Sequence, residues 1–253
     1  MIARLLATLL VVTALAGCAT APPPPAGDVL ALPEVPKFSN ARPGDVSPSG
    51  WKVWQLSGLK RPTQYELVDY EGRTVVFARA SASASGLVFP VSVDLAEFPL
   101  LHWQWKVPAM IDGADNTRRG TEDSPVRVVV AFDGDKSKLS FDDRLFADQF
   151  RMFTKQEFPF ALLMYIWENR APVGTVISSL HTGRSKMIVA GSGEMKLGVW
   201  HDVLRNVRED YERAFGEPAP RVKSVGIMTD SDNTGSTASA YYGDIQFLRS
   251  AEK

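Results

Sequence analysis

Short apolar or alternating runs recur along the chain from Trp51 onward, separated by residues typical of turns. In the clearest run, LLHWQWKV at 100–107, every second residue from Leu101 is apolar and the residues between are polar, which is the period of a strand with one buried face. Gly, Asp, Asn and Pro separate the runs, as in DYEGRT, FDGDK and HTGRS. About eleven such strands predict an all-β-dominated chain, folded as a two-layer antiparallel β-sandwich.

Two segments carry the period of a helix instead. The first, SFDDRLFADQFRMF at 140–153, opens with Ser140 and has Asp143 three positions later, the spacing of a capping box. The second, DVLRNVREDYERAFG at 202–216, ends on Gly216, a natural helix stop. Because a helix on a sandwich buries one side, we expect both apolar stripes to face the core. These stripes consist of Phe146, Phe150 and Phe153 in the first segment and of Val203, Val207, Tyr211 and Phe215 in the second.

The first residues, MIARLLATLLVVTALAGC, have one basic residue, an apolar stretch and small residues before a cysteine, the order of a secretory signal rather than of a spanning helix. The end of this segment, LAGC, resembles the lipobox of bacterial lipoproteins. That resemblance implies a signal peptide over residues 1–17, lipidation of Cys18 and, from Ala19, the outer membrane of a Gram-negative cell with the domain facing the periplasm. The alternative is a plain secretory signal that happens to end near a cysteine. Cys18 is the only cysteine, so an intramolecular disulfide is excluded.

Composition then divides the rest of the chain. Residues 18–49, with successive prolines at 22–25, predict a stiff, extended tether, and residues 50–250 a single β-sandwich domain. Hydrophobic residues make up 45% and charged residues 23%, ordinary values for a protein with a core. The net charge of −1 becomes −2 once residues 1–17, which contain Arg4, are removed. A nucleic-acid partner would need a basic patch or stripe, so we expect none.

Several segments together resemble a bacterial family catalogued as domain of unknown function 3047. They are GWKVWQLSGLKRPTQYELV, LLHWQWKVP, EDSPVRVVVAFDGD, LMYIWENR and WHDVLRNVREDYERAFGEPAPRVKSVGIMTDSDNTGSTASAYYGDIQF, and the resemblance covers roughly residues 50–248. It brings no established activity. The C-terminal segment is also distantly similar to the last strands of galactose-binding-like jelly rolls, which include many carbohydrate-binding modules. This second likeness implies a jelly-roll-like sandwich but does not fix a function.

The residues needed for most catalytic constellations are missing. No Gly-x-Ser-x-Gly elbow occurs, and the lipidated cysteine leaves no thiol nucleophile. His102, His181 and His201 lack the spacing that gathers a zinc ion. No glycine-rich phosphate loop follows a strand and opens a helix. We therefore expect no catalytic residues and no metal set.

Carboxylates are the remaining candidates for chemistry. Glu168 follows Trp167, and Asp123 precedes the strand that carries Arg127. Two acids across a cleft are what a glycosidase requires. Taken singly, Glu168 is interpreted as a solvated strand end and Asp123 as a turn acid paired with Arg127. Their position beside tryptophans keeps a binding groove open as the alternative.

The stretch TDSDNTGSTASAYYGDI at 229–245 partly fits the start of a calcium loop, D-x-D-x-T-G. The fifth position is Thr and the twelfth is Tyr instead of Glu, so an EF-hand is rejected. A calcium site with fewer ligands, from Asp230, Asp232 and Asn233, and a ligand-contacting edge stay open beside the interpretation we favour, an exposed polar loop without calcium. We expect Asp244 to hold a neighbouring loop through its backbone amides.

These features lead to three hypotheses. The first is a membrane-tethered, non-catalytic binding module of the bacterial cell envelope, with a glycan or another envelope ligand. The second is a polysaccharide hydrolase or lyase that uses two of Asp123, Glu168 and Asp230. The third is a structural envelope lipoprotein that contacts other proteins. The expected ligand-binding residues are Asp123, Arg127, Trp167, Glu168, Asn169, Asp230, Asp232 and Asn233.

Overall fold

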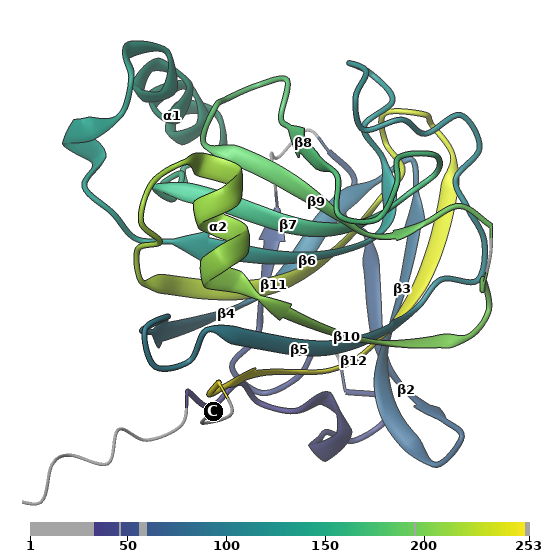
Figure 1. Ribbon diagram of the computed structural model, residues 1–253. Coiled ribbons are helices and arrows are strands. Elements are labelled where there is room, and N and C mark those ends of the chain that lie inside the picture. The colour runs from purple at the N-terminus through teal and green to yellow at the C-terminus, as the bar shows by residue number, and fades with distance from the viewer. Residues whose placement is uncertain (1–32, 46, 56–59, 195, 251–253) are drawn as a thin grey trace, which may run out of the picture. The chain divides into compact units, whose positions relative to one another are not determined.

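Two β-sheets stack face to face in the computed structural model, which describes residues 33–45, 47–55, 60–194 and 196–250 (Figure 1). The predicted β-sandwich is confirmed, with 44% of residues in strands. The described residues belong to one compact unit. The predicted signal peptide, Cys18 and the first part of the tether lie outside them. Neither helix in the described ranges has the length and apolarity that crossing a bilayer requires.

The larger sheet, sheet A, has seven strands. All its strand pairs are antiparallel except β7 with β9, which run parallel. The parallel pair arises because β8 follows β7 in the chain but lies at the edge, so that β9 returns between them. The strand order is β1 (Lys52–Gln55), β4 (Ala84–Val93), β11 (Val222–Asp230), β6 (Ser124–Phe132), β7 (Ala161–Glu168), β9 (Ser185–Ser192) and β8 (Val176–Ser178).

The smaller sheet, sheet B, has five strands, and every neighbouring pair is antiparallel. The run at 100–107 supplies its strand β5 with the predicted alternation, because Leu101, Trp103 and Trp105 are fully buried while the polar residues between them are not. The strand order is β10 (Trp200–Asn206), β5 (Leu100–Lys106), β12 (Thr237–Leu248), β3 (Arg73–Ser81) and β2 (Gln64–Tyr70).

The main core lies between the two sheets, and the two-residue period of each strand decides which side chains enter it. On β6, Val126, Val128 and Val130 belong to this core. Val129 points to the opposite, outer face of sheet A and joins a second apolar cluster there. Arg127, between Val126 and Val128, therefore also points to the outer face. The position of the candidate site follows from this alternation.

Two α-helices accompany the sheets, α1 (Phe141–Thr154) and α2 (Val207–Phe215), with short 3-10 turns at Phe38–Asn40 (η1) and Lys136–Lys138 (η2). The predicted cap of α1 is confirmed, since Ser140 accepts a hydrogen bond from the backbone amide of Asp143. Phe146 and Phe150 pack on the outer face of sheet A, but Phe153 is exposed, so its predicted burial was wrong.

The second predicted helix begins later than expected. Residues 202–206 lie in strand β10, because they pair in continuous register with β5, and the sheet contact overrides their helical spacing. Val203 is thus a strand residue, whereas Val207 and Tyr211 are buried helix residues of the main core. Gly216 ends the helix in the left-handed conformation, as predicted.

The folded unit reaches further toward the N-terminus than residue 50. Phe38 is 1% exposed and contacts the ring of Trp51 at a centroid distance of 4.9 Å. The carboxylate of Asp244 accepts hydrogen bonds from the backbone amide and the hydroxyl of Ser39, at 2.9 and 2.6 Å. The expected role of Asp244, holding a neighbouring segment through a backbone amide, is confirmed. The described residues of 33–45 therefore pack on the domain and do not belong to a free tether.

Candidate functional site

A cavity of about 220 Å³ lies on the outer face of sheet A, beside α1. A neighbouring cavity of about 190 Å³ shares Trp54, Phe150 and Leu162 with it, so the two adjoin each other on the sheet. Apolar side chains make most of the wall, and its methionines give a surface that adapts to irregular shapes. The apolar wall consists of Trp54, Phe146, Phe150, Phe158, Leu162, Met164, Met187 and Met228.

Polar side chains close one end of the cavity. They come from segments far apart in the sequence. Strands β6, β9 and β11 have one end each on this side of sheet A, and the loops beside these strand ends meet there. Concave apolar sites with a few convergent polar groups are typical of ligand sites. The main members of this polar end are Lys60, Asn116, Glu122, Arg127, His181, Asp230 and Asn233.

Arg127 and Asp230 form the centre of this polar end. Their strands β6 and β11 are antiparallel neighbours, which brings the two side chains together. The guanidinium donates from Nε and Nη2 to the two carboxylate oxygens at 2.9 and 3.1 Å, and both side chains are buried. Burial raises the pKa of the Asp230 carboxyl, while the Arg127 charge favours its ionised form. The prediction of an exposed loop acid was wrong for Asp230, which ends strand β11 inside the protein.

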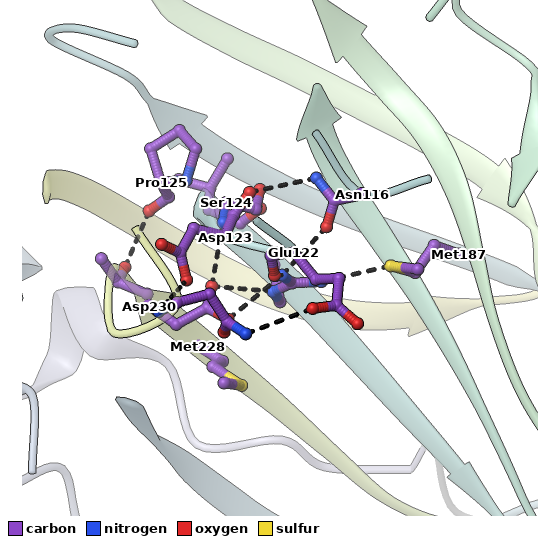
Figure 2. A network of polar contacts seen from close by, with 12 residues as sticks. Asn116, Glu122, Asp123, Ser124, Pro125, Met187, Met228 and Asp230 are labelled. Atoms are coloured by element: carbon purple, nitrogen blue, oxygen red, sulfur yellow. Dashed lines mark hydrogen bonds and ion pairs between the residues drawn. The ribbon is translucent and has the colours of Figure 1, made fainter. Parts of the chain in front are cut away.

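Further contacts fix the guanidinium in place. Nη2 of Arg127 also donates to the side-chain oxygen of Asn116 at 3.1 Å and to the backbone oxygen of Glu122 at 2.5 Å. Asn116, Glu122, Asp123 and Asp230 thus lie in one polar network (Figure 2). A guanidinium held by a carboxylate, an amide and a carbonyl is a rigid feature of the site, since its fork geometry is satisfied on several sides.

The rim of the cavity carries a carboxylate–imidazole pair. Glu122 lies 3.2 Å from Nε2 of His181 and also accepts hydrogen bonds from the backbone amide of Gly120 and the side chain of Asn233. The His181 side chain is 51% exposed, so it is the most accessible member of this pair. Imidazole, amide and carboxylate groups at a rim can exchange hydrogen bonds with a ligand hydroxyl.

Asp123 has partners other than the predicted one. Its carboxylate accepts from the backbone amides of Asn233 and Thr234, at 3.1 and 2.7 Å, and from the Thr234 hydroxyl at 2.6 Å. The predicted ion pair of Asp123 with Arg127 was wrong, because Arg127 uses Asp230 instead. Asp123 therefore holds the 233–234 turn against the site.

The other predicted residues divide between the two faces of β7. Trp167 is 2% exposed and belongs to the main core, with its indole N–H donating to the backbone oxygen of Gly193. Its ring therefore faces away from the cavity, although its backbone oxygen accepts from Ser124. Glu168 is also buried, so the prediction of a solvated side chain at the strand end was wrong. Its carboxylate accepts hydrogen bonds from the backbone amides of Arg170 and Ala171.

Asn169 lies just beyond the end of β7 and its side chain donates to the backbone oxygen of Ile111 at 2.8 Å. Ile111 lies in the same loop as Asn116, so this contact helps to hold the loop in the position where Asn116 binds Arg127. Glu168 approaches the same loop, with its Oε1 3.5 Å from the amide nitrogen of Asn116. These residues support the site from behind and do not line the cavity.

Three carboxylates come within metal-ligating distance of each other. One oxygen from each of Asp123, Asp230 and Asp232 lies within 4.8 Å of the others. Positive groups already face two of them, since Arg127 pairs with Asp230 and Lys60 with Asp232 at 2.5 Å. The third carboxylate, that of Asp123, accepts hydrogen bonds from two backbone amides and a hydroxyl. The donor set suits calcium, but the nearby cations oppose its binding.

The apolar wall and His181 line the cavity although neither was predicted as part of the site. The helical spacing predicts that the phenylalanines of α1 face the core, and nothing in the linear pattern places Trp54 of β1 in the same cavity as Met187 of β9. A usable signal existed in β7, whose outward residues Leu162 and Met164 are apolar although a solvated face would be polar. An apolar outer face indicates that another element, here α1, covers the strand.

Comparisons with known proteins concern the family and the architecture. The family model described as "Protein of unknown function (DUF3047)" matches residues 49–246. The search of curated proteins found no match. The xyloglucanase domain of NopAA, a type three effector from Sinorhizobium fredii, in complex with cellobiose, is 11% identical, with a TM-score of 0.43 and coverage of 84% of this chain and 100% of that chain.

Two further solved structures are similar at the same level. The carbohydrate recognition domain of Emp47p is 12% identical, with a TM-score of 0.42 and coverage of 89% of this chain and 100% of that chain. The K1 cleaved adhesin domain of Lys-gingipain from Porphyromonas gingivalis W83 is 12% identical, with a TM-score of 0.36 and coverage of 87% and 98%. Carbohydrate-recognising and glycan-cleaving domains are thus among the similar structures, and at these scores none of them carries an activity over to this chain.

Proposed function

The chain belongs to the family described as "Protein of unknown function (DUF3047)", as its motifs predicted, and from this premise we propose that it is a non-catalytic binding module of the bacterial cell envelope. One observation carries the proposal. A cavity with an apolar wall has a polar end assembled from distant segments of the chain, around the buried Arg127 and Asp230. Such a composite end positions hydrogen-bonding groups toward a ligand that also has an apolar face.

The class of ligand we propose is a glycan. A sugar ring has an apolar face of C–H groups and a rim of hydroxyls, and it requires an aromatic surface beside hydrogen-bonding groups. Trp54 supplies an aromatic ring, and His181, Asn233 and Lys60 supply polar groups at the other end of the same cavity. The volume of about 220 Å³ lies below the range typical of drug-sized ligands, so the cavity suits the end of a chain or a short saccharide.

The state of the carboxylates supports binding rather than catalysis. Asp230 is engaged by Arg127, Glu168 by backbone amides and Asp123 by amides and a hydroxyl. A general acid or nucleophile must reach the substrate, and in the described part of the chain these acids instead hold protein groups. Glu168 and Asp123 also do not line the cavity.

A hydrolase remains the second candidate because of one observation. Oxygens of Asp123 and Asp230 lie within 4.8 Å of each other, and the Asp123 charge contributes to the raised pKa of Asp230. Two neighbouring acids, one of which has a raised pKa, are an arrangement that glycosidases use. Measurable turnover of a polysaccharide panel by the wild type, abolished in Asp123→Asn, would establish this function in place of the first.

The third candidate function is that of a structural envelope lipoprotein that contacts other proteins, and the outward side of α1 favours it. Large apolar side chains are exposed there, and an exposed apolar patch indicates contact with another molecule. A Phe141→Ser, Phe153→Ser variant leaves the cavity wall intact. Loss of cellular function with unchanged saccharide binding would support a role in contact with another envelope protein. The exposed residues are Phe141, Leu145, Met152 and Phe153.

The cell-envelope location in this proposal rests on the sequence. The LAGC segment and Cys18 imply a lipid anchor, and residues 18–32 would form the tether between the anchor and the domain. The membrane partner is thus the bilayer that holds the anchor.

A titration of short neutral oligosaccharides against the soluble domain tests the proposed ligand. Trp54→Ala should weaken binding about tenfold or more, since a ring contact of about 1.5 kcal/mol corresponds to that factor. Val53→Ala is the matched control, because Val53 neighbours Trp54 on β1, is 60% exposed and does not line the cavity. Absence of binding to every saccharide, or equal loss in both variants, would contradict a glycan site in this cavity.

A further inference from the structure

The outer face of sheet B carries a strip of aromatic rings that no part of the proposed function uses. Tyr241 of β12 lies between Phe77 of β3 and Tyr70 of β2, with centroid distances of 4.7 and 4.9 Å. Trp200 of β10 continues the strip at 5.9 Å from Tyr70. All four rings keep part of their surface exposed. Because Trp200 lies on edge strand β10 and Tyr70 on edge strand β2, the strip spans the sheet from one edge strand to the other.

Positive charges lie along this strip. The Arg73 guanidinium is 4.8 Å from the Trp200 centroid, the Lys106 ammonium 4.7 Å from that of Tyr70, and the Arg79 guanidinium 5.3 Å from that of Phe77. Within the described ranges none of these cations forms an ion pair with a carboxylate. The strip thus combines flat apolar surfaces with positive charges that form no close ion pair with the described carboxylates.

Acidic side chains on the same face are few. Asp202 accepts hydrogen bonds from His102 and Gln104, so it is engaged within the sheet. Glu66 opposes Phe77 in the register of β2 and β3 and is exposed. Asp202 also interacts electrostatically with Arg73. Three cations against these two acids leave an excess of one positive charge among these residues, to which the Arg61 guanidinium beside Arg79 adds another.

A cavity of about 220 Å³ extends the strip at the end where Arg79 lies. Its lining contains two guanidinium groups, an amide and two hydroxyls, and no carboxylate: Arg61, Pro62, Gln64, Arg79, Ser81 and Ser83. Hydroxyl and amide groups next to paired guanidiniums match the hydrogen-bonding pattern of a carboxylate beside hydroxyls.

Packing explains part of this arrangement but not all of it. Tyr70 and Arg73 lie at the end of the β2–β3 hairpin, and their contacts with Trp200 and Gln104 hold that end on the sheet. Arg61 and Arg79 are exposed, and their guanidiniums make no hydrogen bond to the described residues. The packing of the β2–β3 hairpin on the sheet therefore does not explain the presence of Arg61 and Arg79.

We propose that the outer face of sheet B binds an acidic polysaccharide, with the rings stacking on sugar faces and Arg61, Arg73, Arg79 and Lys106 pairing with its carboxylates. A polymer with uronic acid units supplies both features along one chain. This surface is separate from the cavity beside α1, which lies on the outer face of the other sheet, so either site can fail without the other.

Affinity electrophoresis through gels containing polygalacturonate tests the proposal, with dextran gels as the neutral comparison. The wild-type soluble domain should be retarded by polygalacturonate and not by dextran, and the retardation should fall as salt rises, because exposed charges are screened. Arg61→Ala with Arg79→Ala should weaken the apparent affinity at least tenfold. The exposed side chains of these two residues make a loss of folding unexpected, and circular dichroism checks it.

The matched control is Arg118→Ala with Arg170→Ala, which removes two exposed charges outside this face. It should retain the affinity of the wild type. Equal loss in both double variants would show an effect of net charge alone and overturn the proposal. No retardation of the wild type, or binding to vesicles of anionic lipid without binding to polygalacturonate, would overturn it as well.

Discussion

Arg127 and Asp230 are joined by two hydrogen bonds across the neighbouring strands β6 and β11, with side chains only 5% and 6% exposed. Removing one partner of a buried ion pair lowers the free energy of unfolding more than replacing both partners by apolar residues. The reason is that a single buried charge is left without a counter-charge. Stability of the domain should therefore depend strongly on keeping the pair whole.

Arg127→Met should lower the free energy of unfolding by about 3–5 kcal/mol. The double variant Arg127→Met, Asp230→Leu should be less destabilised than the single one, since no unpaired carboxylate remains. Urea unfolding followed by circular dichroism measures both, with Arg118→Ala as an exposed control. A single variant as stable as the wild type would show that the pair contributes nothing to the fold.

The attachment of α1 should depend on pH through Asp143. Burial disfavours its charged form, but hydrogen bonds from Thr182, Ser140 and Gly183 outweigh this and lower its pKa below the ordinary 3.8. A lowered folded-state pKa means that the unfolded chain binds the proton first as the pH falls. The stabilisation is therefore complete well above pH 3.8 and is lost as the pH falls through the lower, folded-state value.

Asp143→Asn should remove this part of the pH dependence. Unfolding free energies measured from pH 6 down to pH 2.5 should differ most between wild type and variant at the upper end and converge at the lower end. Asp142→Asn, an exposed neighbour on α1, is the control. A constant difference across the whole range would show that the hydrogen bonds do not depend on the charge of Asp143.

Calcium should not stabilise the protein. Lys60 and Arg127 already face Asp232 and Asp230, and a divalent cation would have to compete with both. Melting temperatures with calcium and with a chelator should agree, because only a ligand of the native state raises them. A rise of several degrees that disappears in Asp232→Asn would overturn this prediction and establish a metal site at the three carboxylates.

Cys18→Ser should prevent lipidation. The variant is then expected to stay uncleaved or to leave the membrane fraction, since one acylated cysteine is the only anchor that the sequence predicts. Cell fractionation with immunoblotting distinguishes precursor from mature protein. A processed variant that still sediments with membranes would rule out the lipid anchor.

The sequence alone determined the class of fold. Alternation in runs such as 100–107 reports burial of one face directly, because a strand has a period of two wherever it lies. Local signals also placed the cap of α1 at Ser140 and the end of α2 at Gly216. The segment 202–206 has helical spacing but forms a strand, because its hydrogen bonds to β5 outweigh the local preference.

Only the tertiary structure decided the site. Arg127 was expected to pair with Asp123, four positions away in the chain. Its partner is instead Asp230, which the pairing of β6 and β11 brings close from more than a hundred residues away. Trp167 was expected in the groove, but its parity on β7 turns the ring into the main core. Which strands become neighbours and which face another element covers depend on contacts between distant segments, and no local period encodes them.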